Sequence, residues 1–272
     1  MMVNYQNNCG PLIPVVSGVP QGSILGPFLC ASFLGSVLLQ SQCARLIKYA
    51  DDMTVIERID KNSDSSFHVD DILRQLRFKK MLVSCNKSKQ MVISRSHNAR
   101  IILHPDFAFV DSISILGVIL NNNLSWDAHF DNVCLSASRR LYALKRLRHV
   151  LTRKQLLQVF VMYVQAMLLY ASPLFCELSY HTKKNINCIH KRAHRIICNV
   201  DCKCDVIPAF EDQRVKQSMS FLLKCEYDDH PLNYCVPRRL FYTNHFCLPT
   251  TRTARRGNSF FSWVCALYNR CI

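Results

Sequence analysis

The sequence predicts an α+β fold, in which antiparallel strands and helices are followed by a mainly helical region. Three observations support this. Short apolar runs flank the residues Ala50-Asp51-Asp52, as in a tight hairpin. Apolar residues recur at helical spacing over residues 69–83, and the pattern from His129 to about Val200 is helical. We expect three regions: residues 1–125, residues 126–200 and residues 201–272, the last with a weak pattern.

The first predicted elements surround a loop rich in glycine and proline. Residues 17–27, SGVPQGSILGP, form this loop, and the apolar density of Phe28–Gln40 predicts a core helix after it. Arg45–Tyr49 and Met53–Ile56 are the two strands predicted for the hairpin.

A helix and further strands are predicted to follow the hairpin. The helix covers Val69–Val83, and its apolar face consists of Ile72, Leu73, Leu76 and Leu82. Met91–Ser94 and Ile113–Leu120 have the composition of strands.

The charge of the chain favours a polyanionic partner. The sequence has 34 Lys and Arg against 19 Asp and Glu, a net charge of +15. Such a balance is typical of proteins that bind nucleic acid or an anionic membrane surface, and it favours such a partner over an acidic-substrate enzyme. The charge alone does not choose between the two partners.

The cysteines indicate an intracellular protein with reduced thiols. There are 15 of them, an odd number, and no signal peptide is recognisable at the start of the chain. One cluster has a zinc site as its alternative interpretation, although its spacing matches no common finger. This cluster contains Cys188, His190, His194, Cys198, Cys202 and Cys204.

Two uncharged stretches have the length of a membrane span. Met1–Ala44 is interrupted by prolines and glycines, and Gln155–Cys176 is interrupted by Gln158, Gln165 and Pro173. We therefore interpret the second stretch as a buried core helix and predict a soluble protein without a membrane partner.

The adjacent carboxylates Asp51 and Asp52 have two explanations. Asp is common in turns, so the pair is compatible with a solvated hairpin tip. A hairpin also fixes two side chains in direction, and carboxylate oxygens are the ligands that Mg²⁺ prefers. Two such ions could activate a 3′-hydroxyl and stabilise a leaving pyrophosphate, which is polymerase chemistry.

Several segments in this order resemble the reverse transcriptases of non-LTR (LINE-type) retrotransposons. They are SGVPQGSILGP, KYADD, RFKKMLVSCNKSKQMVIS, SISILGVILNNNLSWDAHF, LYALKRLR, LLYASPLF and INCIHKRAHRII. The resemblance covers most of residues 15–200 and implies a partial polymerase palm, with residues 126–200 as a helical thumb. A group II intron maturase matches the fourth segment less well.

The resemblance implies roles for several residues near the hairpin. Asp51 would be the principal ligand of the two Mg²⁺ ions, with Asp52 beside it, and Tyr49 would lie beside the primer end. Lys89 would neutralise charge on the triphosphate of a deoxynucleoside triphosphate, and its alternative is a solvated lysine. The residues placed against the incoming nucleotide and the RNA template are Pro20, Gln21 and Gly22.

The segment Arg139–Lys154 is rich in basic residues. We expect a helix with Leu141, Leu144, Leu147 and Leu151 on its apolar face, and either a solvated basic face or one that binds a primer–template duplex. The candidate nucleic-acid-binding residues are Arg139, Arg140, Lys145, Arg146, Arg148, Arg153 and Lys154. Trp126 and His129 are interpreted as structural.

The resemblance also implies a missing ligand. In that family a further aspartate, on a strand upstream of the glycine-rich loop, completes the metal site. The sixteen residues before Ser17 contain no acidic residue, so we expect the isolated chain to be N-terminally truncated and catalytically incomplete. Two hypotheses follow: a reverse transcriptase fragment, or a non-enzymatic nucleic-acid-binding remnant of such an element. The nucleus suits either, although no clear basic localisation cluster is present.

Overall fold

A computed structural model describes most of the chain. The described residues are 4–5, 8–9, 18, 22–59, 66–93, 103–175, 178–198, 207–240, 245–248 and 259–271. They form two compact units, Met1–Asp111 and Ser112–Ile272. Strands and helices are both present, which confirms the predicted α+β class. The units divide ahead of the boundary predicted at residue 125 because the strands after Asp111 contact the first long helix that follows them.

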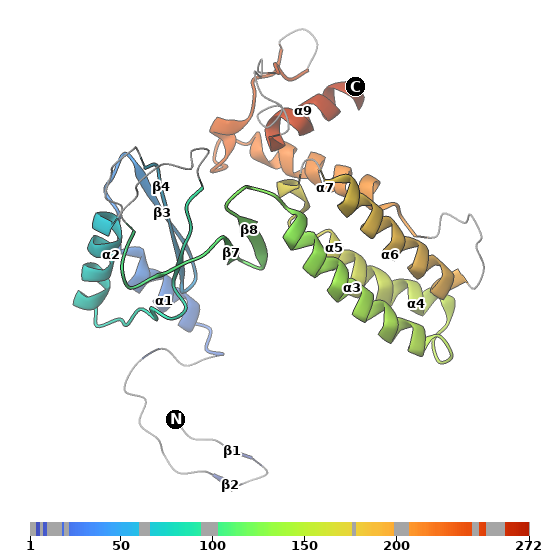
Figure 1. The fold of residues 1–272 in the computed structure, drawn as a ribbon, viewed down its shortest axis with the longest axis horizontal. Coiled ribbons are helices and arrows are strands. Elements are labelled where there is room, and N and C mark those ends of the chain that lie inside the picture. The colour runs from blue at the N-terminus through green and yellow to red at the C-terminus, as the bar shows by residue number, and fades with distance from the viewer. Residues whose placement is uncertain are drawn as a thin grey trace. The chain divides into compact units, whose positions relative to one another are not determined.

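Among its described residues, the first unit contains two helices and three strand pairs (Figure 1). The pairs β1–β2 and β3–β4 are antiparallel, and β5–β6 is parallel. The element bounds are Asn4–Tyr5 (β1), Asn8–Cys9 (β2), Gly26–Gly35 (α1), Ala44–Tyr49 (β3), Asp52–Glu57 (β4), Ser66–Phe78 (α2), Lys89–Gln90 (β5) and Ala108–Phe109 (β6).

A small core holds α1, α2 and the β3–β4 hairpin together. Its buried residues are Leu34, Val37, Ile72 and Leu76, and Leu46, Met53 and Val55 of the hairpin pack against them. The alternation along β3 and β4 therefore places one face of the hairpin on this core and the other in solvent. This confirms the hairpin and the helix predicted to follow it.

Helix α1 differs from the core helix predicted over Phe28–Gln40. It ends at Gly35, and most of its apolar side chains are exposed, with Phe28 at 69%. The prediction was wrong because apolar content does not say how many faces of a helix are covered. Here only the face carrying Leu34 meets the core.

Helix α2 ends earlier than predicted. Lys80 adopts a left-handed conformation (φ 57°), and the amide of Met81 donates to the carbonyl of Leu76 (2.9 Å), which closes the helix as in a Schellman motif. Leu82 therefore lies beyond the helix and is 98% exposed, so its place on the apolar face was wrong. The strand predicted at Met91–Ser94 was also wrong, since β5 covers Lys89–Gln90 and Ser94 lies outside the described residues.

The second unit is mainly helical, with one antiparallel strand pair, β7–β8. Its α-helices and strands are Ser112–Ile115 (β7), Val118–Asn121 (β8), Asp127–Leu147 (α3), Arg153–Phe160 (α4), Ala166–Leu168 (α5), Tyr180–Cys198 (α6), Phe210–Cys225 (α7) and Phe260–Cys271 (α9). A π-helix covers Val161–Gln165, and 3-10 turns cover Ser172–Leu174 and Asn233–Cys235. The helical pattern to residue 198 confirms that prediction, whereas the strand predicted over Ile113–Leu120 is divided into β7 and β8 by a turn at Leu116 and Gly117.

The β7–β8 turn shows why this segment needs a glycine. Leu116 and Gly117 both have positive φ (49° and 80°), the combination of a two-residue hairpin turn. The hydroxyl of Tyr170 donates to the carbonyl of Leu116 (2.8 Å), so the helical region holds the turn in place.

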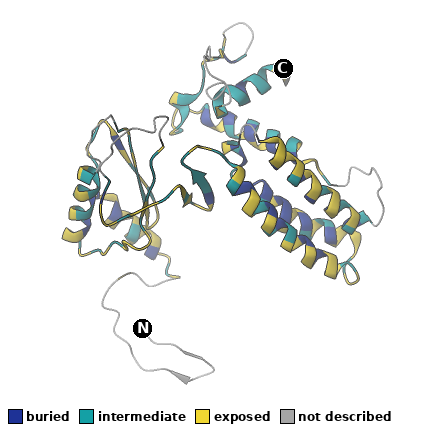
Figure 2. Ribbon diagram, in the orientation of Figure 1, coloured by how far each residue is buried: buried dark blue, intermediate teal, exposed yellow. Residues whose placement is uncertain are grey.

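Helices α3, α4 and α6 lie side by side around the largest core (Figure 1). Figure 2 shows buried residues on their facing sides and exposed residues on their outer sides. Trp126 and His129 pack on Phe175, and their ring centroids lie 5.0 and 5.2 Å from the centroid of the Phe175 ring. These contacts agree with the structural role predicted for both residues. Burial lowers the pKa of His129, so this ring is held neutral inside the core.

The helix predicted over Arg139–Lys154 is divided in two. α3 ends at Leu147, and Thr152 begins α4 with a capping box, in which its side chain and that of Gln155 each bond the other's backbone amide. Leu141 and Leu144 are buried as expected. Leu147 is exposed and Leu151 lies in the connecting turn, so the predicted four-leucine face was wrong.

The run Arg153–Leu174 is long and apolar enough to cross a membrane by length and composition alone. Leu156, Phe160, Val164 and Leu168 from this run are buried in the core formed with α3 and α6. The run therefore contributes one face to the core of this unit, whereas only 39% of its most apolar stretch is buried, less than the buried core helix predicted for Gln155–Cys176.

Residues beyond 201 add a smaller core. Leu222 of α7, Phe246, and Val264 and Cys265 of α9 are its buried members. Arg239 binds both carboxylate oxygens of Glu226 (2.5 and 2.7 Å) and stacks on the ring of Phe246 at 4.5 Å. A bidentate pair of this kind fixes the loop that carries Arg239 on the end of α7.

Candidate functional site

The β3–β4 hairpin carries the predicted carboxylates at its tip. Tyr49 and Asp52 are paired in register, and Ala50 and Asp51 form the turn between them. Both carboxylates are exposed. The structure therefore brings together Tyr49, Asp51 and Asp52, as the sequence predicts.

Ala50 gives the turn its shape at an energetic cost. Its φ is 51°, a left-handed conformation that costs a residue with a Cβ about 1–2 kcal/mol. Such backbone outliers persist only where the surrounding structure imposes them, and they are frequent at functional sites. Five paired positions above the turn supply that constraint, from Ala44↔Glu57 to Lys48↔Met53.

Lys48 anchors the hairpin to the end of α1. Its ammonium donates to the carbonyls of Leu34 (2.8 Å), Gly35 (3.2 Å) and Val37. These carbonyls close the last turn of α1, where a cation is favourable because the helix dipole is negative there. The residue directly before Tyr49 thus ties the carboxylate-bearing strand to the helix that follows the glycine-rich loop.

The sequence analysis did not identify this role of Lys48. The available signal was its position in β3, on the same face as Ala44 and Leu46, where a charged side chain needs a partner. The partner itself cannot be read from the sequence, because the three carbonyls belong to a segment eleven to fourteen residues away.

The glycine-rich loop is described in part. Gly22 is exposed with φ 83°, a conformation natural to glycine, and a Cβ built there would meet no atom within 4 Å. The hydroxyl of Ser23 accepts a hydrogen bond from the amide of Gly26 (3.0 Å), which satisfies a donor in the first turn of α1. Pro20 and Gln21 lie outside the described residues, so their roles stay predictions.

Lys89 lies in a separate sheet from the hairpin. It is exposed in β5 and pairs with Ala108 of β6. Its role beside a triphosphate therefore stays a prediction.

The hairpin supplies hard oxygen donors, the ligand type that suits Mg²⁺. In the part of the chain that the structure describes, no group of three or more His, Cys, Asp or Glu side chains is placed to hold a metal ion. The donor type at Asp51 and Asp52 thus fits the ion, whereas a complete ligand set would need a further group. Cys188 and Cys198 lie on α6 and form no disulfide, and Cys202 and Cys204 are outside the described ranges.

The predicted basic residues lie in the second unit, around the α3–α4 connection. Arg139, Arg140, Lys145 and Arg146 are exposed on α3, and Arg153 and Lys154 are exposed in the first turn of α4. Arg148 is half-buried in the connecting turn. Arg140 also donates to the carbonyl of Tyr163, so it joins α3 to the π-helix in addition to any contact with nucleic acid.

Helix α6 enlarges this basic surface, and the sequence analysis did not include it. Arg192 donates to the hydroxyl of Ser138 on α3 (3.3 Å), and His181 lies 3.9 Å from Asp131, so the two helices run in the same direction side by side. The exposed basic residues of α6 are Lys183, Lys184, Lys191, Arg192 and Arg195. The available signal was that Glu177 is the only acidic residue between Asp131 and Asp201.

Asp127 fixes the other end of the α3–α6 pair. Its carboxylate accepts hydrogen bonds from the hydroxyls of Ser179 (2.6 Å), Thr182 (3.1 Å) and Ser125 (3.1 Å). The bond from Ser179 is the main cause that lowers the pKa of Asp127 below its ordinary value. These hydrogen bonds join the first turn of α3 to the first turn of α6.

Comparison with known proteins bears on the first part of the chain. Residues 2–120 match the family model described as reverse transcriptase (RNA-dependent DNA polymerase), and these residues include Gly22, the β3–β4 hairpin and Lys89. This match confirms the resemblance to a reverse transcriptase for that part of the chain, whereas the non-LTR type stays a prediction. No curated protein and no solved structure matches the chain.

Proposed function

We propose that the chain is the palm and thumb part of the RNA-directed DNA polymerase of a non-LTR retrotransposon. The observation that carries this proposal is the β3–β4 hairpin, which presents Asp51 and Asp52 at an exposed, conformationally constrained tip within the residues that match the reverse transcriptase family. In this proposal, residues 1–125 are the partial palm and residues 126–200 the helical thumb.

Asp51 and Asp52 would hold Mg²⁺ through their carboxylate oxygens. When bound, two such ions supply a nucleophilic 3′-oxygen and stabilise the leaving pyrophosphate. The chain's own contribution is geometric: the strand pairing fixes the two carboxylates, and Lys48 holds their strand against α1. Tyr49, paired with Asp52, would lie beside the primer end.

We further propose that these 272 residues alone do not extend a primer. Two metal ions need a bridging ligand, and the described residues place no third acidic group beside Asp51 and Asp52 at the tip of the hairpin. Without catalysis, the chain would still bind RNA template, DNA primer and deoxynucleoside triphosphates.

The alternative is a non-enzymatic nucleic-acid-binding remnant of such an element. It is favoured by the exposed basic residues of α3, α4 and α6, which do not depend on the hairpin. In this hypothesis the hairpin persists only as a folding element.

Manganese binding separates the two hypotheses without requiring activity. Mn²⁺ titrated into the chain should broaden the amide NMR signals around Ala50–Asp52, and Asp51→Asn with Asp52→Asn should abolish the effect. The matched control is Asp228→Asn with Asp229→Asn, which removes another adjacent, exposed carboxylate pair. Broadening that is equal in both double variants would leave only the remnant hypothesis.

Primer extension on an RNA template with Mg²⁺ tests the inactivity. We expect no extension by the chain or by the Asp51→Asn, Asp52→Asn variant, together with salt-sensitive binding to an RNA–DNA duplex. Extension that disappears in the variant would show that another carboxylate completes the site, and the inactivity proposal would then be wrong.

A further inference from the structure

One row of α3 side chains runs along the border with α6. Residues spaced three and four apart in a helix lie one above the other, and this row consists of Asp131, Leu135, Ser138 and Tyr142. Two of its members contact α6. The Nδ1 atom of His181 lies 3.9 Å from a carboxylate oxygen of Asp131, and the hydroxyl of Ser138 accepts a hydrogen bond from Arg192 (3.3 Å). Leu135 and Tyr142 therefore lie beside α6 as well.

A matching row of α6 lies opposite. It consists of His181, Asn185, Cys188 and Arg192. His181 and Arg192, at its two ends, make the contacts with α3, and Cys188 is exposed between them. We call the exposed surface along these two rows the α3–α6 face.

The α3–α6 face combines an exposed aromatic ring with cations. Tyr142 is 64% exposed and Leu135 is 51% exposed. Arg139 and Arg146 lie one turn to either side of Tyr142, and further basic residues lie one or two turns from Cys188. These further residues are Lys184, Lys191, Arg192 and Arg195. Within the two rows the only carboxylate is that of Asp131, at the end away from Arg146.

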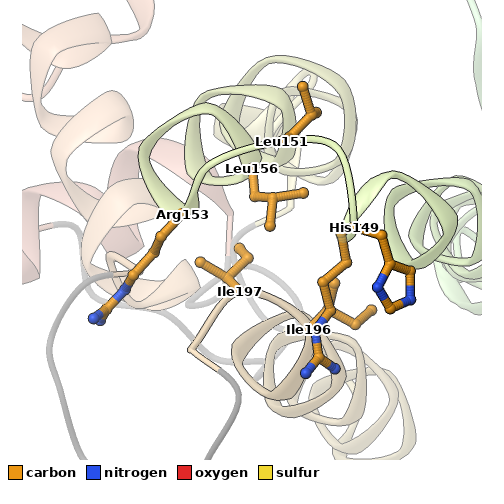
Figure 3. A pocket seen from close by; sticks show the side chains of 7 residues that line it. His149, Leu151, Arg153, Leu156, Ile196 and Ile197 are labelled. Carbon is orange, nitrogen blue, oxygen red and sulfur yellow. The ribbon is translucent and has the colours of Figure 1, made fainter.

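A cavity at the connection between α3 and α4 borders the other end of this face. Arg148, His149 and Arg153 line it together with apolar residues. Figure 3 shows Leu156 and Ile197 between Arg153 on one side and His149 on the other. These two apolar side chains are only 3% and 4% exposed. The cavity thus adds cations to this end of the face and no apolar contact, which comes instead from the row on α3.

We infer that the α3–α6 face binds a single-stranded nucleic acid, with an unpaired base stacked on the ring of Tyr142 and the neighbouring phosphates on Arg139 and Arg146. Every base has a π-face that stacks on an aromatic side chain, and cations beside the ring hold the backbone that carries the base. In a duplex the faces of the bases are covered by neighbouring base pairs. A duplex therefore engages the cations of this face but gains nothing from Tyr142.

This inference rests on the nucleic-acid-binding part of the proposed function, and it adds a preference for an unpaired strand at a defined position. Seven residues separate Leu135 from Tyr142, a rise of about 10 Å along α3. A second base can therefore lie against Leu135. The site then spans a few nucleotides, which a strand of about ten nucleotides covers.

Removal of the Tyr142 ring tests the stacking without changing the charge. Tyr142→Ala in the full chain should lower the affinity for a fluorescent oligodeoxythymidylate of about ten nucleotides by about tenfold, the effect of losing one base contact. Affinity for a blunt duplex should stay within about twofold, and Tyr142→Trp should restore the single-strand affinity. An equal loss for both probes, or no loss for either, would overturn the inference.

Tyr163→Ala is the matched control. Tyr163 is 60% exposed, close to the value for Tyr142, but it lies on the π-helix. Its carbonyl accepts from Arg140, which is two residues from Ser138 and so on another side of α3. We expect Tyr163→Ala to change either affinity by no more than about twofold. A loss of single-strand affinity as large as that of Tyr142→Ala would contradict a site on the α3–α6 face.

An abasic strand separates the base from the phosphates. It has the same backbone and length as the oligodeoxythymidylate but no bases, so the wild-type chain should bind it about tenfold more weakly, and Tyr142→Ala should bind it as the wild-type chain does. Equal wild-type affinity for the two strands would mean a surface for any polyanion, an acidic protein segment included, and would overturn the base contact. If the wild-type chain binds neither strand nor duplex, the nucleic-acid part of the proposed function fails, whereas intact duplex binding with an unaffected Tyr142→Ala variant refutes this inference alone.

Discussion

Replacement of Lys48 by Met should loosen the hairpin that carries Asp51 and Asp52. The ammonium of Lys48 donates to three carbonyls at the end of α1, two of them at 2.8 and 3.2 Å. A hydrogen bond to a charged group contributes about 1.5–3 kcal/mol, and removal leaves carbonyls that water can partly satisfy because the site is only half-buried. Met keeps the apolar stem, so we expect a total loss of about 2 kcal/mol.

Hydrogen exchange of the β3–β4 amides measures this loss locally. A change of about 2 kcal/mol in the opening free energy corresponds to about 30-fold faster exchange. The amides of α3, which belongs to the other unit, serve as an internal reference.

Arg45→Met is the matched control for Lys48→Met. Arg45 lies on the same strand as Lys48 and has a side chain of similar length, but it is exposed on the opposite face of the hairpin. Its replacement should change the opening free energy by no more than about 0.5 kcal/mol. If Lys48→Met exchanges no faster than Arg45→Met, the contacts at the end of α1 do not hold the hairpin and our reasoning is refuted.

Three further predictions concern the second unit. Asp127→Asn should lower the free energy of unfolding by about 1 kcal/mol at pH 7, a value reduced because Asp127 is exposed. The pKa of Asp127 is lowered in the folded state, so only the ionised carboxylate is stabilising. Thermal melts should therefore show that the stability difference between the wild-type chain and the variant fades as the pH falls below 3.8, the ordinary pKa of the group. Burial lowers the pKa of His190, so the unfolded chain binds more protons and stability should fall as pH drops below about 6.5; His190→Leu should weaken this fall in urea titrations, whereas the exposed His181→Gln should not. Arg239→Lys should lose about 2 kcal/mol by breaking the bidentate pair with Glu226, and calorimetry showing a loss no larger than for the exposed Arg238→Lys would contradict this.

Local patterns in the sequence determined the candidate site. The β3–β4 hairpin follows from alternation along two short runs and from the turn residues between them, and both signals act over a few positions. The helical content of α3–α6 follows in the same way, whereas the turn between β7 and β8 was not predicted. Asp51, Asp52 and Tyr49 were accordingly found together where the sequence predicts them.

Several helix ends could have been found from the sequence but were not. The Thr152–Gln155 capping box is visible as Thr-x-x-Gln, and it divides the basic segment that we predicted as one helix. The end of α2 gave no such warning, because its left-handed residue is Lys80 where a glycine is usual.

The tertiary structure alone decided what each charged side chain does. Sequence identifies the net charge of +15 and the basic segments, and strand alternation separates Lys48 from Arg45, but it does not show that Lys48 binds carbonyls at the end of α1. Nor does it place Arg148 and Arg153 with Ile196 and Ile197 around one cavity. Hairpins and helices form through interactions between near neighbours in the chain, whereas the partner of a long side chain comes from whichever segment packs beside it, and that is fixed only when the cores assemble.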